Sequence, residues 1–196
     1  MGTNNEIIER EASTTDEALA NLACRDPLWF KELYQRYQPR IYAYCLSRSG
    51  HPQDAQDLTS QVFLAALEGL ARYNPQRSFG AGLFGIARHK LVDRLRRQTP
   101  ELPLESAENF ADGQVSVEEH FEQKLRWAAV AQALRSLPAE QAEALTLRLF
   151  GGLSTAQSAQ VMGKSEAAIK MLVLRGLRSL QNRLALDDAT TQEVAQ

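Results

Sequence analysis

The chain has 196 residues, 44% of them hydrophobic, and its 22 Lys and Arg residues nearly balance 24 Asp and Glu residues. This length suits one medium domain or two small ones, and a net charge of −2 excludes a uniformly basic surface while leaving local basic patches open. Every apolar run is far shorter than the roughly 18 residues of a transmembrane helix, and the polar N-terminus lacks the apolar segment of a signal peptide, so we expect a cytoplasmic protein without membrane insertion.

Cysteine and histidine positions give no support to an enzyme. The two cysteines, Cys24 and Cys45, are not spaced as metal ligands, and one disulfide would be a weak framework for this length. Cys45 lies on an apolar helical stripe, which favours packing over catalysis. The histidines, His51, His89 and His120, are scattered, and no zinc-protease, P-loop or nucleophile-elbow motif occurs. We therefore expect no catalytic residue, no metal site and no cofactor.

The spacing of apolar residues predicts an all-α fold. Residues 1–25 are expected to form a polar extension. Asp26 is typical of a helix N-cap and Pro27 of the first helical position, and the helix that follows carries one apolar stripe at steps of three and four. The stripe comprises Phe30, Leu33, Tyr34, Tyr37, Ile41, Tyr44 and Cys45. A second helix is expected from about residue 53 to 73 and, after a polar turn, a third as far as Arg97.

An acidic stretch follows the third helix. Residues 98–123 contain no Lys or Arg, and prolines interrupt regular structure there. The acidic residues are Glu101, Glu105, Glu108, Asp112, Glu118, Glu119 and Glu122. We expect an acidic linker over residues 99–123 that joins two small helical domains, over residues 26–98 and 124–185.

The second domain is expected to contain further helices. One lies near residues 118–137, and another ends at Phe150, before two glycines of the kind that terminate helices. The last helix runs towards Leu184, and a polar tail over residues 186–196 is expected to fray.

A helix-turn-helix is predicted within this domain. Ser154 and Gln157 have the spacing of a capping box, Gly163 allows a tight turn, and Ser165 caps the following helix. The small Ala159 stands where two helices must pack closely. In such a motif the second helix enters the major groove of DNA with its N-terminal residues first.

Three glycines open the third helix in an order that resembles a nucleotide-binding motif. Gly80–Gly85 reads GAGLFG, the G-x-G-x-x-G of a dinucleotide-binding turn. That turn works between a strand and a helix, whereas a predicted helix and a polar turn precede it here. A nucleotide-dependent enzyme is therefore disfavoured. Each glycine inside a helix still costs about 1 kcal/mol relative to alanine, so these glycines require another explanation.

Two basic clusters stand on either side of the acidic stretch. The first comprises Arg88, Lys90, Arg94, Arg96 and Arg97, joined by His89, and the second comprises Lys164, Lys170, Arg175, Arg178 and Arg183. A solvated helix face explains either cluster taken alone. Two basic helices in two domains favour two separate contacts with phosphate backbones.

With both halves described, the chain resembles a bacterial sigma factor of the extracytoplasmic-function (ECF) group, in the sigma-70 family. Residues 30–97 resemble region 2 of that group, with DAQDLTSQVFLAAL at residues 54–67 the most recognisable part. Residues 133–184 resemble region 4. The resemblance implies a subunit that binds core RNA polymerase, recognises promoter DNA and performs no chemistry itself. It also implies an anti-sigma factor as a further partner.

The resemblance implies four binding surfaces. The second helix docks on the clamp helices of the largest polymerase subunit through Asp54, Asp57, Leu58, Gln61 and Phe63. The next turn and basic helix capture single-stranded bases of the −10 element through Arg72, Tyr73, Asn74, Phe79, Arg88, Lys90, Arg94 and Arg97. The second helix of the helix-turn-helix binds the −35 duplex through Ser165, Glu166, Ala167, Lys170, Met171, Leu174, Arg175 and Arg178. The outer apolar surface of region 4 meets the polymerase flap.

Some residues leave alternatives open. Local packing is the other role for Tyr73 and Phe79. Relatives carry a Trp and a basic residue in an FRAWLFRIA pattern where this chain has Gly82 and Gly85, which we expect to loosen the −10 loop. Apolar residues such as Met171 replace the small polar or basic residues of relatives. Either they contact thymine methyl groups or recognition relies on the basic residues of that helix. The alternative function is a helix-turn-helix regulator that binds duplex DNA without polymerase.

Overall fold

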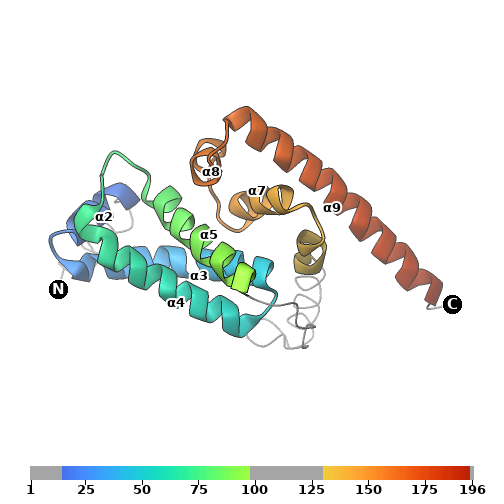
Figure 1. Ribbon diagram of the computed structural model, residues 1–196, viewed down its shortest axis with the longest axis horizontal. Coiled ribbons are helices and arrows are strands. Elements are labelled where there is room, and N and C mark those ends of the chain that lie inside the picture. Colours follow the sequence, from blue (N-terminus) through green and yellow to red (C-terminus); the bar gives the residue numbers. More distant parts are fainter. Residues whose placement is uncertain (1–14, 98–129, 195–196) are drawn as a thin grey trace, which may run out of the picture.

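The computed structural model describes residues 15–97 and 130–194, with side chains described as far as Arg183. Every regular element in these ranges is a helix, which confirms the predicted all-α fold. The predicted acidic linker lies outside the described residues, as does most of the helix expected near residues 118–137, of which only residues 130–135 are described as helical. Figure 1 shows α2 to α5 gathered on one side and α7 to α9 on the other.

The first domain is built on three long helices that pack on one another: α3 (Phe30–Ser49), α4 (Pro52–Gly69) and α5 (Phe79–Arg97). The predicted cap at Asp26 is present, since its Oδ1 accepts a hydrogen bond from the Leu28 amide at 3.0 Å. It opens a short 3-10 turn, η1 (Pro27–Trp29), which leads into α3. A second 3-10 turn, η2 (Leu70–Arg72), ends the α4 segment. The buried core of this domain includes Leu33, Ile41, Tyr44, Leu83, Phe84 and Leu91.

The expected polar extension ends earlier than the sequence predicts. Asp16–Ala23 forms a helix, α2, capped by Thr15, whose Oγ1 accepts a hydrogen bond from the Ala18 amide at 3.2 Å. Leu19 of this helix is fully buried in the core of the first domain. A helix this short is unstable alone and is stabilised by packing. Because that packing involves residues far away in the sequence, the local sequence pattern did not predict the helix.

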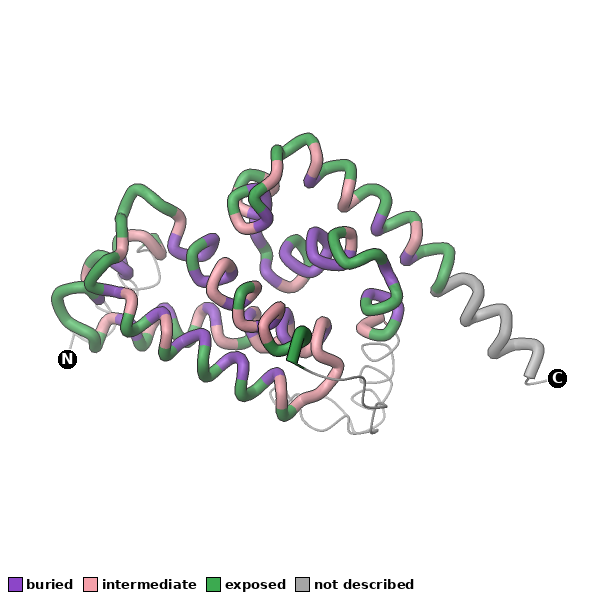
Figure 2. Tube along the Cα trace, viewed as in Figure 1, coloured by how far each residue is buried: buried purple, intermediate pink, exposed green. Residues whose placement is uncertain are grey.

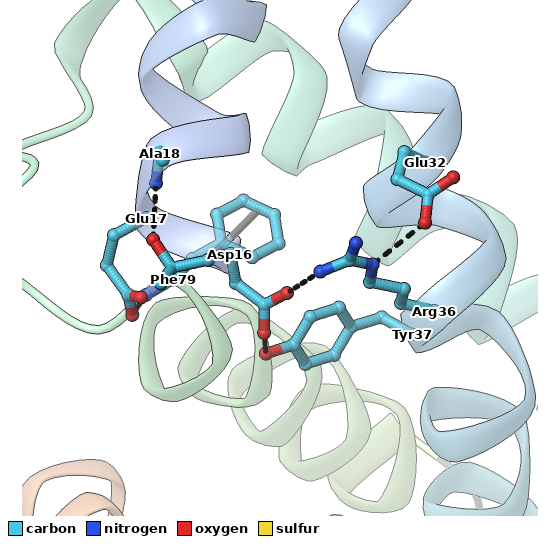
Figure 3. Close-up of polar contacts among 8 residues, drawn as sticks. Asp16, Glu17, Ala18, Glu32, Arg36, Tyr37 and Phe79 are labelled. Carbon is cyan, nitrogen blue, oxygen red and sulfur yellow. Dashed lines mark hydrogen bonds and ion pairs between the residues drawn. The ribbon is translucent and has the colours of Figure 1, made fainter. Parts of the chain in front are cut away.

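A network of polar contacts joins α2 to α3 and α5 (Figure 3). Asp16 accepts hydrogen bonds from Arg36 Nη1 at 3.0 Å and from Tyr37 Oη at 2.6 Å. Glu17 accepts one from the Phe79 amide at 3.3 Å, at the start of α5. Burial first, and then the hydrogen bond to Asp16, raises the pKa of Tyr37 well above its ordinary value, so the phenol remains a donor. The N-terminal helix therefore fixes the beginning of α5.

The second domain contains the predicted helix-turn-helix, in α8 (Thr155–Met162) and α9 (Glu166–Val194), packed on α7 (Ala139–Leu149). Both bonds of the capping box between Ser154 and Gln157 are present. Gly163 has a φ of +64°, a left-handed conformation that favours glycine, and Ser165 Oγ caps α9 by accepting from the Ala168 amide at 3.2 Å. The helix continues to Val194, through most of the stretch expected to fray, because no glycine or proline interrupts residues 185–194.

The two domains pack directly against each other, with α8 lying on α5. One hydrophobic cluster includes Phe84 from the first domain and Leu147 and Leu153 from the second. Arg40 Nε donates to the Gly151 carbonyl oxygen at 3.1 Å. Figure 2 shows buried segments on the facing sides of both helix groups. The sequence predicts two domains but contains no signal for this contact between them.

Candidate polymerase and DNA surfaces

The outer face of α4 is the surface that the sequence assigned to polymerase. Asp57 and Gln61 are exposed on it, as predicted. Leu58 and Phe63 are only 3% and 5% exposed, so this structure does not present them to a partner, and their contact with polymerase stays a prediction. They face inward because each is an apolar residue on the side of α4 that packs on the core, where the Phe63 ring lies 4.6 Å from that of Tyr34.

Asp54, a predicted polymerase contact, takes part in an ion pair within the chain. Its Oδ1 lies 2.5 Å from Nη2 of Arg94, and the ion pair joins the beginning of α4 to the end of α5. The sequence assigned these two residues to different partners, polymerase and DNA. In the structure each neutralises the other, and the pair holds two helices together.

Sequence reasoning missed Leu64, which is 57% exposed on α4. It follows Asp57 by seven residues and Gln61 by three, so all three share one face of the helix. Its helical spacing from Asp57 is the signal in the sequence that places Leu64 on this face. The surface that the structure offers to a partner on α4 is therefore Asp57, Gln61 and Leu64, here called the α4 face.

The turn between α4 and α5 holds its aromatic rings inward. Phe79 is buried, with ring centroids 5.5 Å from Tyr37 and 6.0 Å from Tyr73 in edge-to-face packing. This burial fits the alternative of local packing, and stacking of Phe79 on bases stays a prediction. Tyr73 is half-buried, and its hydroxyl donates to the Arg77 carbonyl oxygen at 2.9 Å. Arg72 and Asn74 are exposed, as predicted for residues that contact DNA.

Two hollows follow the glycine-containing face of α5, against α4. The first, of about 130 Å³, is lined by residues that include Tyr73, Phe79 and Gly82. The second, of about 470 Å³, is lined by Ala65, Gly82, Gly85, Ile86, His89 and Lys90. Because the two share Gly82 and Ile86, they form one groove from the turn to the basic end of α5, here called the glycine groove.

Only one of the three glycines of the GAGLFG segment is required by packing. A Cβ atom added at Gly80 would lie 2.6 Å from Tyr37 Oη, whereas one added at Gly82 or Gly85 would meet no atom within 4 Å. Gly80 therefore allows α5 to approach α3. Gly82 and Gly85 leave the glycine groove unfilled. All three lie inside a helix that no strand precedes in the described residues, so a dinucleotide-binding turn is excluded at this position.

The basic residues of α5 lie in different surroundings. Arg97 is exposed at the end of the helix, and Lys90 is half-buried beside the glycine groove. Arg88 points towards the second domain, with its Nε 3.9 Å from Glu143 Oε1. A contact between Arg88 and a DNA phosphate is therefore in competition with the contact between the domains.

Glu143 is the centre of the polar contacts between the domains. Its carboxylate, 6% exposed, accepts a hydrogen bond from Tyr44 Oη at 2.6 Å and lies 3.5 Å from Arg48 Nη2. Burial first, and then the charge of Glu143, raises the pKa of Tyr44 well above its ordinary value, so its hydroxyl remains a donor. A buried carboxylate needs such partners, and here all of them come from the first domain.

The predicted recognition helix is free along its outer face. All eight residues that the sequence assigned to the −35 duplex, from Ser165 to Arg178, are exposed. The opposite face is buried through Ile169, Gly176 and Leu180. A Cβ atom added at Gly176 would lie 2.7 Å from Leu145 Cδ1, so the glycine allows α7 and α9 to pack closely. The outer face of α9 therefore presents basic and apolar side chains to solvent.

Within residues 15–97 and 130–194, no cluster of three or more His, Cys, Asp or Glu side chains is arranged to hold a metal ion. No helix in the described part of the chain combines the length and apolar character needed to span a membrane.

Comparisons with known proteins match both halves of the chain. The family model described as "Sigma-70 region 2" matches residues 33–101, and that described as "Sigma-70, region 4" matches residues 127–180. The ECF RNA polymerase sigma factor BldN of Streptomyces coelicolor is 40% identical over 163 residues, which cover 82% of this chain and 61% of BldN. The ECF RNA polymerase sigma factor SigF of Caulobacter vibrioides is 32% identical, over 76% of this chain and 82% of SigF.

A solved structure shares the fold. The structure of CnrH in complex with the cytosolic domain of CnrY aligns with a TM-score of 0.67 over 88% of this chain and 98% of CnrH, at 24% sequence identity. The likeness supports the arrangement of helices described above.

Proposed function

This chain belongs to the ECF group of sigma-70 family RNA polymerase sigma factors, and we propose that it directs promoter-specific initiation by bacterial core RNA polymerase. One observation carries the proposal. Region 2 and region 4 occur in family order on one chain, each with an exposed helix face of suitable chemistry. The chain supplies binding and positioning, and the polymerase supplies the chemistry.

The α4 face binds the clamp helices of the largest polymerase subunit. Leu64 contributes apolar area, while Asp57 and Gln61 supply a charge and hydrogen bonds at its rim. Exposed apolar residues framed by polar ones are typical of protein interfaces. The outer apolar surface of the second domain, which includes the exposed Leu149, is the candidate contact for the polymerase flap.

The turn after α4 and the basic side of α5 hold the melted −10 strand. Arg72 and Asn74 are exposed on the turn, and Lys90 stands beside the glycine groove. Backbone phosphates are attracted by such cations, and bases stack on aromatic side chains. Tyr73 is the ring available for stacking, whereas Phe79 supports it from behind.

Binding of both promoter elements requires the domains to separate. The centres of the −10 and −35 elements are about 25 base pairs apart, roughly 85 Å along straight B-DNA at 3.4 Å per pair. The docked domains hold α8 against α5, and Glu143 occupies Arg88. We therefore propose that the docked arrangement is the free factor, and that core polymerase and promoter together stabilise an opened one.

An anti-sigma factor is the proposed regulatory partner. The family resemblance implies one, and the CnrH structure contains the cytosolic domain of CnrY. A protein that covers the α4 face of the docked factor would block polymerase and leave the domains together. Loss of core polymerase binding when such a protein is added to the purified factor is the corresponding measurement.

The second candidate function is a regulator that acts on duplex DNA alone. The exposure of the recognition helix in the docked arrangement favours it, because duplex binding by α9 does not need the domains to open. Run-off transcription with purified core polymerase on genomic fragments separates the two. We expect discrete transcripts that depend on the added chain. Duplex binding without any transcript would establish the regulator and contradict the sigma factor proposal.

A further inference from the structure

The outer face of the recognition helix has an unusual mixture of side chains. Met171 and Leu174 are apolar, yet both lie on the side of α9 that faces away from the domain, where they are 46% and 41% exposed. Lys170, Arg175 and Arg178 are exposed beside them. Residues 166–178 contain no Asn, Gln, Ser or Thr. Residues 166–178 of this face therefore offer cations and apolar groups, and Glu166 is the only side chain among them with a hydrogen-bond acceptor.

Each base pair presents its own pattern of chemical groups in the major groove, and cationic and apolar side chains do not bind all of these groups equally well. Guanine presents two acceptors to Arg or Lys, adenine pairs best with Asn or Gln, and thymine presents an apolar C5 methyl group. Side chains that bind adenine in two places are missing from residues 166–178. Those that contact a methyl group or donate to guanine are present. The helix is thus equipped for thymine and guanine.

The spacing of the apolar pair fits adjacent base pairs. Successive residues of an α-helix turn by about 100° and rise by about 1.5 Å. Met171 and Leu174 therefore lie within about 60° of each other and about 4.5 Å apart along the helix axis, close to one base-pair step of about 3.4 Å. Ala167 and Arg178 continue the same line in both directions. The buried residues Ile169, Gly176 and Leu180 lie on the opposite side.

The cations favour DNA over a protein as the occupant of this face. Lys170 and Arg175 lie on opposite sides of the apolar pair, Arg178 continues its line, and none of the three has an ion-pair partner among the described residues. Their combined charge complements a phosphate backbone on each side of a groove. An apolar strip intended for a protein partner needs no such border.

We propose that the −35 element is read through thymine methyl groups, which Met171 and Leu174 contact at two neighbouring base pairs, with guanine or phosphate contacts from Arg175 and Arg178. The inference rests on the proposed function of α9 as the −35 reader. It assigns sequence specificity to two apolar side chains. The preferred element accordingly contains two adjacent thymines on one strand or on opposite strands.

The test uses the full chain with core polymerase and a promoter library whose −35 region is randomised. Selected templates are then resynthesised with deoxyuridine in place of the enriched thymines, which removes the methyl groups and leaves base pairing intact. Each methyl group is worth about 0.8 kcal/mol when buried, or about a fourfold change in affinity. We expect the wild-type factor to lose about fourfold per substitution, and the variant Met171→Ala with Leu174→Ala to bind both templates equally.

Leu177→Ala provides the matched control, because Leu177 is an exposed leucine of the same helix that lies outside the line of Met171 and Leu174. It is expected to retain the wild-type sensitivity to deoxyuridine. Equal binding of thymine and deoxyuridine templates by the wild-type factor would overturn the inference while transcription continues and the proposed function stands. Absence of transcription from every library member would overturn the proposed function, and this inference with it.

Discussion

Gly80 and Gly82 stand two residues apart in the first turn of α5, yet a methyl group added at each would meet different surroundings. At Gly80 it would displace Tyr37 Oη, which is held by its hydrogen bond to Asp16. At Gly82 it would enter the glycine groove. One glycine is thus required by packing, and the other costs helix stability without a packing gain.

This difference gives a prediction on stability. Gly82→Ala is expected to raise the free energy of unfolding by about 1 kcal/mol, because alanine has the higher helix propensity. Gly80→Ala is expected to lower it by about 1–3 kcal/mol, because overpacking must move Tyr37. Denaturant unfolding of both variants provides the measurement, and each serves as the control for the other. Equal effects of the same sign would contradict the assignment.

The two free cysteines also differ in their surroundings, here in their exposure to solvent. Cys24 is exposed, whereas Cys45 is buried on α3. Burial raises the pKa of the Cys45 thiol to about 12. The reactive thiolate forms only as the pH approaches the pKa, so at pH 8 about one Cys45 side chain in ten thousand is ionised.

Thiol labelling tests this assignment directly. With a disulfide reagent at pH 8, the native chain is expected to react rapidly at one thiol, and the chain in denaturant at two. The Cys24→Ser variant is expected to be nearly unreactive until it unfolds. Rapid modification of Cys45 in the native Cys24→Ser variant would contradict its burial in the core.

At the scale of elements, α4 carries opposite tasks on its two faces. Its inner face supplies Leu58, Val62 and Phe63 to the core, and its outer face presents Asp57, Gln61 and Leu64. A resemblance to a family motif assigns one role to every residue of the matched segment and does not distinguish the inner face of the helix from the outer face. Helical periodicity does, and it explains why two of the five predicted polymerase contacts are buried.

The α4 face is tested by reversing one charge on it. Asp57→Arg is expected to weaken binding to core polymerase at least tenfold, by placing a cation where the interface has a carboxylate, and to leave the unfolding midpoint unchanged because Asp57 is exposed. Asp93→Arg makes the same charge change on α5 and is expected to bind normally. If both variants bound core polymerase equally well, the interface would lie elsewhere.

Local signals in the sequence predicted most of the helices. The capping box of Ser154 and Gln157 and the left-handed Gly163 determine the ends of α8 through neighbours in the chain, so they are readable. The helix α2 was missed because it is short and stabilised by packing, and the end of α9 because no glycine or proline ends it at Leu184. The burial of Phe79 depends on Tyr37, far away in the sequence, and no local pattern reveals it.

At the scale of the whole molecule, the contact between domains links the fold to the function. Glu143 of α7 is surrounded by Tyr44, Arg48 and Arg88 of the first domain. Removing one partner of a buried charged group is costly because the others remain without compensation. The docked arrangement therefore depends strongly on one carboxylate.

Neutralising that carboxylate is expected to favour the open factor. Glu143→Gln keeps the size of the side chain but leaves Arg48 and Arg88 without their charged partner. A larger radius of gyration in solution scattering, together with at least threefold tighter binding of single-stranded −10 DNA by the free factor, is the expected result. Glu140→Gln, an exposed change on the same helix, is expected to alter neither quantity. A variant at Glu143 as compact as the wild type would show that this contact does not hold the domains together.

We propose that this sigma factor must separate its two docked domains to initiate transcription. The side chains of Ser78 and Gln157 meet across the domain contact at 2.8 Å. In a Cys24→Ser background, the pair Ser78→Cys and Gln157→Cys allows a short, cleavable thiol cross-link between the domains, with each single variant as control. Run-off transcription is expected to disappear on cross-linking and to return when the cross-link is cleaved. Equal transcription by the cross-linked and the cleaved factor would contradict the requirement for domain separation.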